Sequence, residues 1–188
     1  MIVKIKIEII CWYYFNYIQM ITITSSRFSN LTWGRNAEYR SKHACCVYGS
    51  PQEFTYKILH DALVFVIEMN NDTNQIEGIG LVRNRPCLDK YYSVYEDGNY
   101  NRYVYKSNYH ICRERLVEYN RPLVESFDHI LFKGKTHLKR GTGFITVPEK
   151  LLNHPKCNKM DMKTELKKIF IDEFNGCEPP SEGKVVAF

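Results

Sequence analysis

One predicted β-hairpin limits the possible folds more than any other feature of the sequence. A continuous apolar run at Ala62–Asn70, ALVFVIEMN, indicates a buried strand. The residues Asn70–Asn74, NNDTN, are typical of a turn. A second strand, QIEGIGLVRN, is predicted at Gln75–Asn84, and Pro86 ends it. The chain therefore contains two adjacent antiparallel strands, at least one of which is buried.

Two glycines lie two residues apart in the second strand of this hairpin. Side chains alternate between the two faces of a strand, so Gly78 and Gly80 belong to the same face. A glycine inside a strand is typical of a bend, or of a place where another backbone or a ligand comes close. We therefore expect a close approach on this face.

The other predicted elements are short and of mixed type, which indicates an α+β fold. Proline, glycine and capping signals separate them. The sequence predicts strands at Ile21–Thr24, Tyr100–His110, His129–Phe132 and Gly143–Pro148, a loop at Ser25–Asn36, helices at Gln52–Leu59 and Arg113–Tyr119, a turn or short helix at Pro148–Leu152, and an amphipathic helix at Met160–Phe174.

The bulk properties suit a single domain of ordinary size. The chain has 188 residues, a formal net charge of +5 and a pI near 8.7, which permit a nucleic-acid partner without requiring one. The apolar run Ile9–Ile18 is too short to span a bilayer, so no membrane partner is expected. Residues 1–19 are predicted to be an N-terminal extension, because Met20 could be an alternative start.

The seven cysteines show no C-x-x-C pair and are odd in number. Metal sites usually have paired ligands at short spacing, and disulfide frameworks usually occur in shorter secreted chains. We therefore expect reduced thiols in an intracellular protein, which could act in a host cytoplasm, nucleus or virion if the protein is viral. No metal and no cofactor is predicted.

A basic run, KGKTHLKRGTGF, lies at Lys133–Phe144. Its glycines allow backbone N–H groups to approach an anion, and its cations can neutralise one. The spacing does not match a G-x-x-x-x-G-K-[ST] phosphate loop. The alternative is a solvated loop that maintains solubility. The candidate phosphate contacts are Lys133, Lys135, His137, Lys139 and Arg140.

Aromatic residues provide two further candidates for contacts with nucleic acid. In NRYVYK, Tyr103 and Tyr105 could stack on bases while Arg102 holds a phosphate, although ordinary cross-strand aromatic pairs explain the pattern equally. In LTWGRN, Trp33 and Asn36 could line a base pocket, although a lone Trp is more often part of a core.

The hairpin VFVIEMNNDTNQIEGIGLV at Val64–Val82 resembles the PUA-like superfamily, particularly its EVE and YTH-related branches. In those domains an acidic position at the end of a strand precedes a turn and an I-x-G-I-G-x-V strand. The resemblance covers roughly Met20–Leu152. It implies a small, strongly curved β-barrel with flanking short helices at 20–155, followed by a C-terminal amphipathic helix and tail at 156–188.

Members of that superfamily generally bind nucleic acid, and the EVE and YTH types take a modified base into an aromatic cage. The resemblance implies that Gly78 and Gly80 belong to the barrel strand and that Trp33 is a cage wall. Abundant Asn, Tyr, Lys and Ile also resemble the composition of proteins from large DNA viruses.

Three functions follow from these patterns. The first is non-catalytic binding of RNA or DNA, with a base pocket at Trp33, Asn36, Gly78 and Gly80. The second is a viral structural or protein-interaction role, in which the C-terminal helix contacts a partner. The third is a metal-dependent nuclease built on Glu68 and Glu77, together with the basic run.

Overall fold

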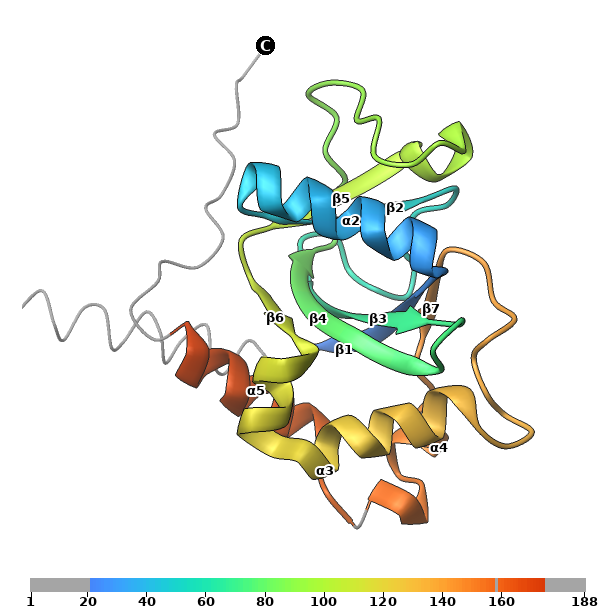
Figure 1. Ribbon diagram of the computed structural model, residues 1–188, viewed down its shortest axis with the longest axis vertical. Coiled ribbons are helices and arrows are strands. Elements are labelled where there is room, and N and C mark those ends of the chain that lie inside the picture. The colour runs from blue at the N-terminus through green and yellow to red at the C-terminus, as the bar shows by residue number, and fades with distance from the viewer. Residues whose placement is uncertain (1–20, 158, 175–188) are drawn as a thin grey trace, which may run out of the picture.

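The computed structural model describes residues 21–157 and 159–174, which form two sheets between two groups of helices (Figure 1). A five-stranded sheet has the order β6-β4-β3-β1-β7, and a two-stranded sheet pairs β2 with β5. The strands are β1 Thr22–Phe28, β2 Cys46–Ser50, β3 Leu63–Asn70, β4 Gln75–Arg83, β5 Tyr103–Ser107, β6 His110–Cys112 and β7 Phe144–Thr146.

Helices lie on both sides of the larger sheet. Helix α2 covers one side, and α3, α4 and α5 lie on the other (Figure 1). Short 3-10 turns join some of the elements. The helical elements are α2 Asn30–His43, η2 Gly98–Asn101, α3 Arg113–Phe132, α4 Glu149–Leu152, η3 Pro155–Cys157 and α5 Met162–Glu173.

The predicted hairpin is confirmed. Strands β3 and β4 pair antiparallel. The pairing runs from Leu63 opposite Arg83 to Asn70 opposite Gln75, with a bulge after Glu68. Strand β1 pairs parallel with β3 along its whole length, and β7 pairs antiparallel with β1. The central strand β3 thus has a partner on each side, which explains why its sequence is almost wholly apolar.

Alternation along β3 divides the interior into two cores. Phe65, Ile67 and Met69 face α3, α4 and α5. Val64 and Val66 face the other way, toward β2, β5 and the loops beside them. Glu68 has the same parity as Val64 and Val66, so it points into the second core, where it is completely buried.

The α+β class is confirmed, but no closed barrel is found within residues 21–157 and 159–174. The described strands instead form a five-stranded sheet and a separate two-stranded sheet. The C-terminal amphipathic helix is also confirmed as α5. It buries Met162, Leu166, Ile169 and Phe170 in the same core as α3, whereas Ile171 is 40% exposed.

The loop predicted at Ser25–Asn36 is wrong. Strand β1 continues to Phe28 because it pairs with β3, and α2 begins immediately afterwards. Ser29 is the N-cap of α2: its Oγ accepts from the Thr32 backbone N–H at 3.3 Å, and the Thr32 Oγ1 accepts from the Ser29 N–H at 2.9 Å. This reciprocal pair starts a helix whose residues have little apolar periodicity.

The helix predicted at Gln52–Leu59 is also wrong, because turns and bends occupy this segment. Ser50 is the last residue of β2, and its Oγ accepts from the Gln52 N–H at 3.2 Å. Phe54 and Ile58 are buried there without helical structure. A capping signal alone cannot stabilise so short a helix in the absence of an amphipathic face.

The strand predicted at His129–Phe132 is the last turn of α3. This helix has a kink at Asn120, whose backbone is not helical and whose Oδ1 accepts from the Leu123 N–H at 3.0 Å. The helix predicted at Arg113–Tyr119 is the part of α3 before the kink, and Pro122 lies just beyond it, where α3 continues to Phe132. The basic run therefore connects a helix to a strand and is not the tip of a hairpin.

The strand predicted at Tyr100–His110 is divided. Residues Gly98–Asn101 form η2, β5 pairs with β2, and β6 joins the edge of the larger sheet beside β4. The extension at 1–19 and the end of the C-terminal tail, from residue 175, lie outside the described residues.

Candidate base-binding cavity

A cavity of about 560 Å³ opens beside the end of β1. Its walls come from β1, the first turn of α2, β2 and the segment around η2. The volume is within the range of about 300–1,000 Å³ that is usual for small-molecule sites. The lining residues include Phe28, Thr32, Gly49, Tyr95, Tyr100 and Gly143.

Three aromatic residues, Phe28, Tyr95 and Tyr100, line the cavity. Phe28 and Tyr95 are buried, and Tyr100 is partly exposed. The rings of Tyr95 and Tyr100 lie 6.5 Å apart, edge to face at 75°. A Cβ atom on Gly49 would lie 2.0 Å from the Tyr100 carbonyl oxygen and 2.8 Å from the Tyr95 ring. Only glycine therefore allows the tyrosine segment to close on β2.

Asn101 holds the tyrosine segment in place. Its side chain is buried, and its Oδ1 accepts from the backbone N–H groups of Val94 at 3.0 Å and Tyr95 at 2.9 Å. Its Nδ2 donates to the Tyr95 carbonyl at 2.7 Å. Because a buried amide fixes this backbone, the aromatic wall exists before any ligand binds.

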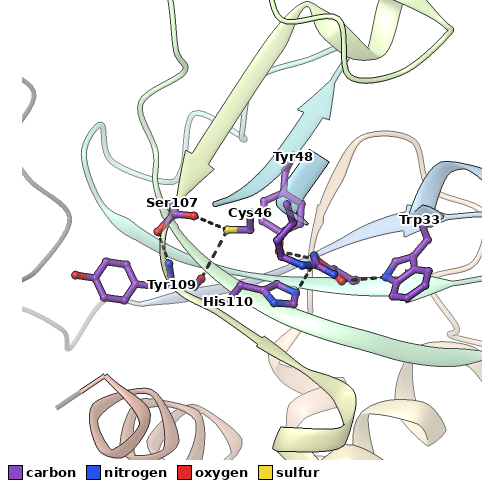
Figure 2. Close-up of polar contacts among 8 residues, drawn as sticks. Trp33, Cys46, Tyr48, Ser107, Tyr109 and His110 are labelled. Carbon is purple, nitrogen blue, oxygen red and sulfur yellow. Dashed lines mark hydrogen bonds and ion pairs between the residues drawn. The ribbon is translucent and has the colours of Figure 1, made fainter. Parts of the chain in front are cut away.

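A buried carboxylate, Glu68, organises the region behind the cavity. Its Oε1 accepts from the Tyr48 hydroxyl at 2.9 Å and lies 3.0 Å from Nε2 of His110 and 3.3 Å from Nη1 of Arg40. Its Oε2 accepts from the Trp33 indole N–H at 3.2 Å. Figure 2 shows Trp33, Tyr48 and His110 converging on this point from α2, β2 and β6.

The carboxylate stays ionised despite its complete burial. Burial alone would raise the pKa of Glu68, but the charges of His110 and Arg40 and the hydrogen bonds from His110 and Tyr48 together lower this pKa to about 2. In turn, burial and the Glu68 charge raise the pKa of the Tyr48 hydroxyl well above its ordinary value. Tyr48 is therefore a permanent donor to the carboxylate.

Two of the elements that Glu68 binds, α2 and β2, also line the cavity. Trp33 follows Thr32 in α2, and Tyr48 precedes Gly49 in β2. In the sheet, Glu68 is the register partner of Ser26, which is also a lining residue. The carboxylate therefore sets the position of α2 and β2 relative to the sheet, and with it the position of the cavity walls.

The two strand glycines make room for this cluster. A Cβ on Gly80 would lie 2.3 Å from the Tyr48 hydroxyl, and one on Gly78 would lie 2.7 Å from Nε2 of His110. The structure shows a close approach on this face, but the nearest atoms belong to side chains and not to the backbone or ligand that the sequence suggested. The groups that approach are the side chains that bind Glu68.

The basic connection, Lys133–Gly143, is attached to the cavity rim. The Lys139 carbonyl accepts from Nη1 of Arg27 at 2.5 Å and from Nδ2 of Asn71 at 3.2 Å, and both of these residues line the cavity. Lys139 Nζ donates to Asn74 Oδ1 at 2.6 Å. The end of the connection, Gly143, has a φ of 66° and lines the cavity itself.

The residues predicted to contact phosphate differ in their exposure to solvent. Lys133, Lys135 and Arg140 are exposed, whereas His137 and Lys139 are partly buried. The His137 Nδ1 accepts from the Lys139 backbone N–H at 3.2 Å. Three cations of the basic connection are therefore exposed and can meet an anion in solution.

The predicted base pocket is only partly reproduced. The structure brings Trp33 together with Gly78 and Gly80 around Glu68, but none of them lines the cavity. Asn36 is fully buried, and neither polar atom of its side chain has a hydrogen-bond partner within residues 21–157 and 159–174. Trp33 therefore belongs to the packing behind the cavity.

The predicted stacking strand is mostly covered. Tyr105 is completely buried against Phe54 and Phe144, so its ring faces cannot meet a base. Tyr103 is partly buried, and only Arg102 is well exposed. The two-stranded sheet uses its tyrosines for core packing, as the alternative interpretation expected.

The aromatic walls were missed by the sequence reasoning. The segment YEDGNY places Tyr95 and Tyr100 on either side of the Asp97–Gly98 turn. Two aromatic residues flanking a turn signal would have indicated this site. Nothing in the sequence shows that Phe28 ends a strand beside them, because that depends on the pairing of β1 with β3.

The nuclease hypothesis gains no support from the positions of the acidic residues. Glu77 accepts from Asn70 and Thr73, whereas Glu68 has its own partners in the second core. Among the described residues, no group of three or more His, Cys, Asp or Glu side chains is placed to hold a metal ion.

The cysteines of the described ranges form no disulfides. The five cysteines within the described ranges, Cys45, Cys46, Cys87, Cys112 and Cys157, are free thiols. Burial raises the pKa of the Cys46 thiol, which favours its neutral form. No helix in this part of the chain is long and apolar enough to cross a membrane.

Comparisons with known proteins supply no family for this chain. No protein-family model matches it, and neither the curated proteins nor the solved structures include a significant match.

Proposed function

We propose that this protein binds nucleic acid without catalysis, holding an unpaired base in the cavity and phosphates on the basic connection. One observation carries the proposal. The Lys139 carbonyl attaches the basic connection to Arg27 and Asn71, which line the aromatic cavity. A base site and a phosphate site thus share one rim.

The chemistry of the two sites suits a single-stranded ligand. Stacking of a base on an aromatic ring contributes about 1–3 kcal/mol and tolerates any base. Lys133, Lys135 and Arg140 are exposed on the basic connection and can neutralise the phosphates that flank the bound base. A methyl group on the base would contribute about 0.8 kcal/mol when buried against the rings, so a modified base fits the same cavity.

We also propose a relationship to the PUA-like superfamily. Two features support it: the hairpin with its paired glycines, and a curved sheet with a second small sheet beside it (Figure 1). In this proposal the two sheets are the two parts of an open barrel.

Replacing Tyr100 with alanine should weaken binding of a short single-stranded oligonucleotide by about 5- to 100-fold, because the base loses a stacking partner. Fluorescence anisotropy with a labelled oligonucleotide measures the effect. Tyr56→Ala is the matched control, since Tyr56 is 90% exposed and does not line the cavity. Equal affinities of Tyr100→Ala and the native protein would exclude this cavity as the base site.

Replacing Lys135 and Arg140 together with alanine should make binding less dependent on salt. Each phosphate contact on a single strand contributes about −0.7 to the slope of log K against log salt, so the slope should fall in magnitude by about 1.4. The control pair, Lys42→Ala with Lys57→Ala, removes the same charge from exposed positions elsewhere. An unchanged slope would assign the phosphates to other residues.

Exposed apolar side chains favour protein interaction as the second candidate function. Large apolar side chains are exposed in the loops before β3 and after β4: Tyr56 90%, Leu59 61%, Leu88 83% and Tyr91 69%. Such exposure is typical of a contact surface when the residues form one patch. A native protein that binds no oligonucleotide even at low salt would favour this role.

A further inference from the structure

A second group of basic side chains lies where α3 ends. His129 is in the last turn of α3, and Lys133 is the C-cap residue. His154 and Lys156 come from the segment between α4 and α5. The rings of His129 and His154 are 5.6 Å apart and tilted by 41°. The Ser126 hydroxyl donates to the Lys156 carbonyl at 3.4 Å, which ties this segment to α3.

No acidic side chain neutralises this group within residues 21–157 and 159–174. None of the four side chains forms an ion pair there, whereas other cations nearby do. Arg113 on α3 pairs with Asp128 at 2.7 Å, and Lys163 on α5 pairs with Glu149. Basic groups that lie close together without a counter-charge repel one another, and an anion removes that cost.

The helix dipole explains only half of the group. Cations near a helix C-terminus are favourable, which accounts for His129 and Lys133. His154 and Lys156 belong to another segment. They add positive charge at the C-terminus of α3, although His129 and Lys133 already offset its partial negative charge. Burial, followed by the charges of His154, Lys133 and Lys156, lowers the pKa of His129, so these groups act on one another.

We propose that His129, Lys133, His154 and Lys156 form a second phosphate site, which binds another phosphodiester of the same nucleic acid. The inference rests on the proposed function, because Lys133 belongs both to this group and to the basic connection. The phosphate path then runs from the cavity rim along the basic connection to the end of α3. Histidine side chains gain positive charge as the pH falls, so an anion should be held more strongly there at lower pH.

Binding at this site should therefore strengthen as the pH falls. The groups that act on His129 are His154 on the facing segment and the two lysines, all of them basic. A bound phosphate supplies the missing negative charge and raises the pKa of both imidazoles. Affinity should increase by about three- to tenfold between pH 7.5 and pH 5.5. This estimate assumes that each protonated imidazole forms one exposed ion pair with the phosphate.

An abasic oligonucleotide tests this site separately from the base cavity, because it carries phosphodiesters and no base. Its affinity for the full chain is measured at pH 7.5 and 5.5, and the imidazole pKa values are measured by NMR with and without it. We expect tighter binding at the lower pH and a rise in the pKa of His129 and His154. His129→Asn with His154→Asn should remove most of the pH dependence.

The matched control is His43→Asn with His60→Asn, which removes two exposed histidines from other segments. If the first double variant is unstable, His154→Asn alone provides the comparison. No binding of the abasic strand, or a pH dependence that survives in His129→Asn/His154→Asn, would overturn the second site. Failure of the base cavity has a different signature: Tyr100→Ala then binds a base-carrying strand as tightly as the native protein.

Discussion

Replacing Glu68 with glutamine should lower the free energy of unfolding by about 3 kcal/mol at pH 7 and by much less at pH 3. The pKa of Glu68 in the folded protein is lowered from 4.5 to about 2. A depressed pKa means that the ionised form contributes stability above pH 4.5. This contribution is lost as the pH falls from 4.5 toward 2. Glutamine resembles the protonated acid, so the two proteins converge at low pH.

Urea unfolding of both proteins at pH 7, 5, 4 and 3 measures this difference. Glu77→Gln is the control, because Glu77 lies on the neighbouring strand, is partly exposed and accepts from Asn70 and Thr73 without an ion pair. The Glu77→Gln substitution should lower the free energy of unfolding by less than about 1.5 kcal/mol at pH 7. A constant difference between native protein and Glu68→Gln from pH 7 to pH 3 would show that the ionised form adds no stability.

Replacing Gly80 with alanine should destabilise the protein by about 3 kcal/mol, because a methyl group there overlaps the Tyr48 side chain. The added Cβ would lie 2.3 Å from the Tyr48 hydroxyl. Tyr48 is completely buried, so it cannot move aside without breaking its 2.9 Å hydrogen bond to Glu68. Thermal and urea unfolding should both show the loss.

The same substitution at Gly34 should have the opposite sign. Gly34 lies inside α2, is exposed, and a Cβ there would meet no atom within 4 Å. Alanine is favoured over glycine in a helix interior by about 0.5–1 kcal/mol, so Gly34→Ala should stabilise the protein by that amount. If Gly80→Ala were as stable as Gly34→Ala, the contact between β4 and Tyr48 would be excluded.

Local sequence was sufficient where one segment carries its own signal. The β3–β4 hairpin combines an apolar run, a turn and a return strand. Each of these parts is predicted from its own residues, without knowledge of the rest of the chain. Helix α5 shows its amphipathic pattern in the same way. The predicted strand after the basic run is confirmed as β7, although only Phe144–Thr146 is paired.

Local sequence failed where pairing or packing with a distant segment decides the conformation. Strand β1 extends to Phe28 because β3 lies beside it, and the apolar turn before Lys133 is helical because α3 packs it against the sheet. An apolar run of four residues fits a strand or a buried helix equally well. Only the neighbours in space distinguish the two.

The sequence alone determined the hairpin, the pair of strand glycines and the presence of a basic connection, since each depends on residues close together in the chain. Only the tertiary structure decided that Tyr48 and His110 fill the space beside the glycines and bind Glu68. It also placed the aromatic cavity at Tyr95 and Tyr100 instead of Trp33. The reason is physical: a buried carboxylate must gather its donors from several distant segments, and two of those segments, α2 and β2, also line the cavity.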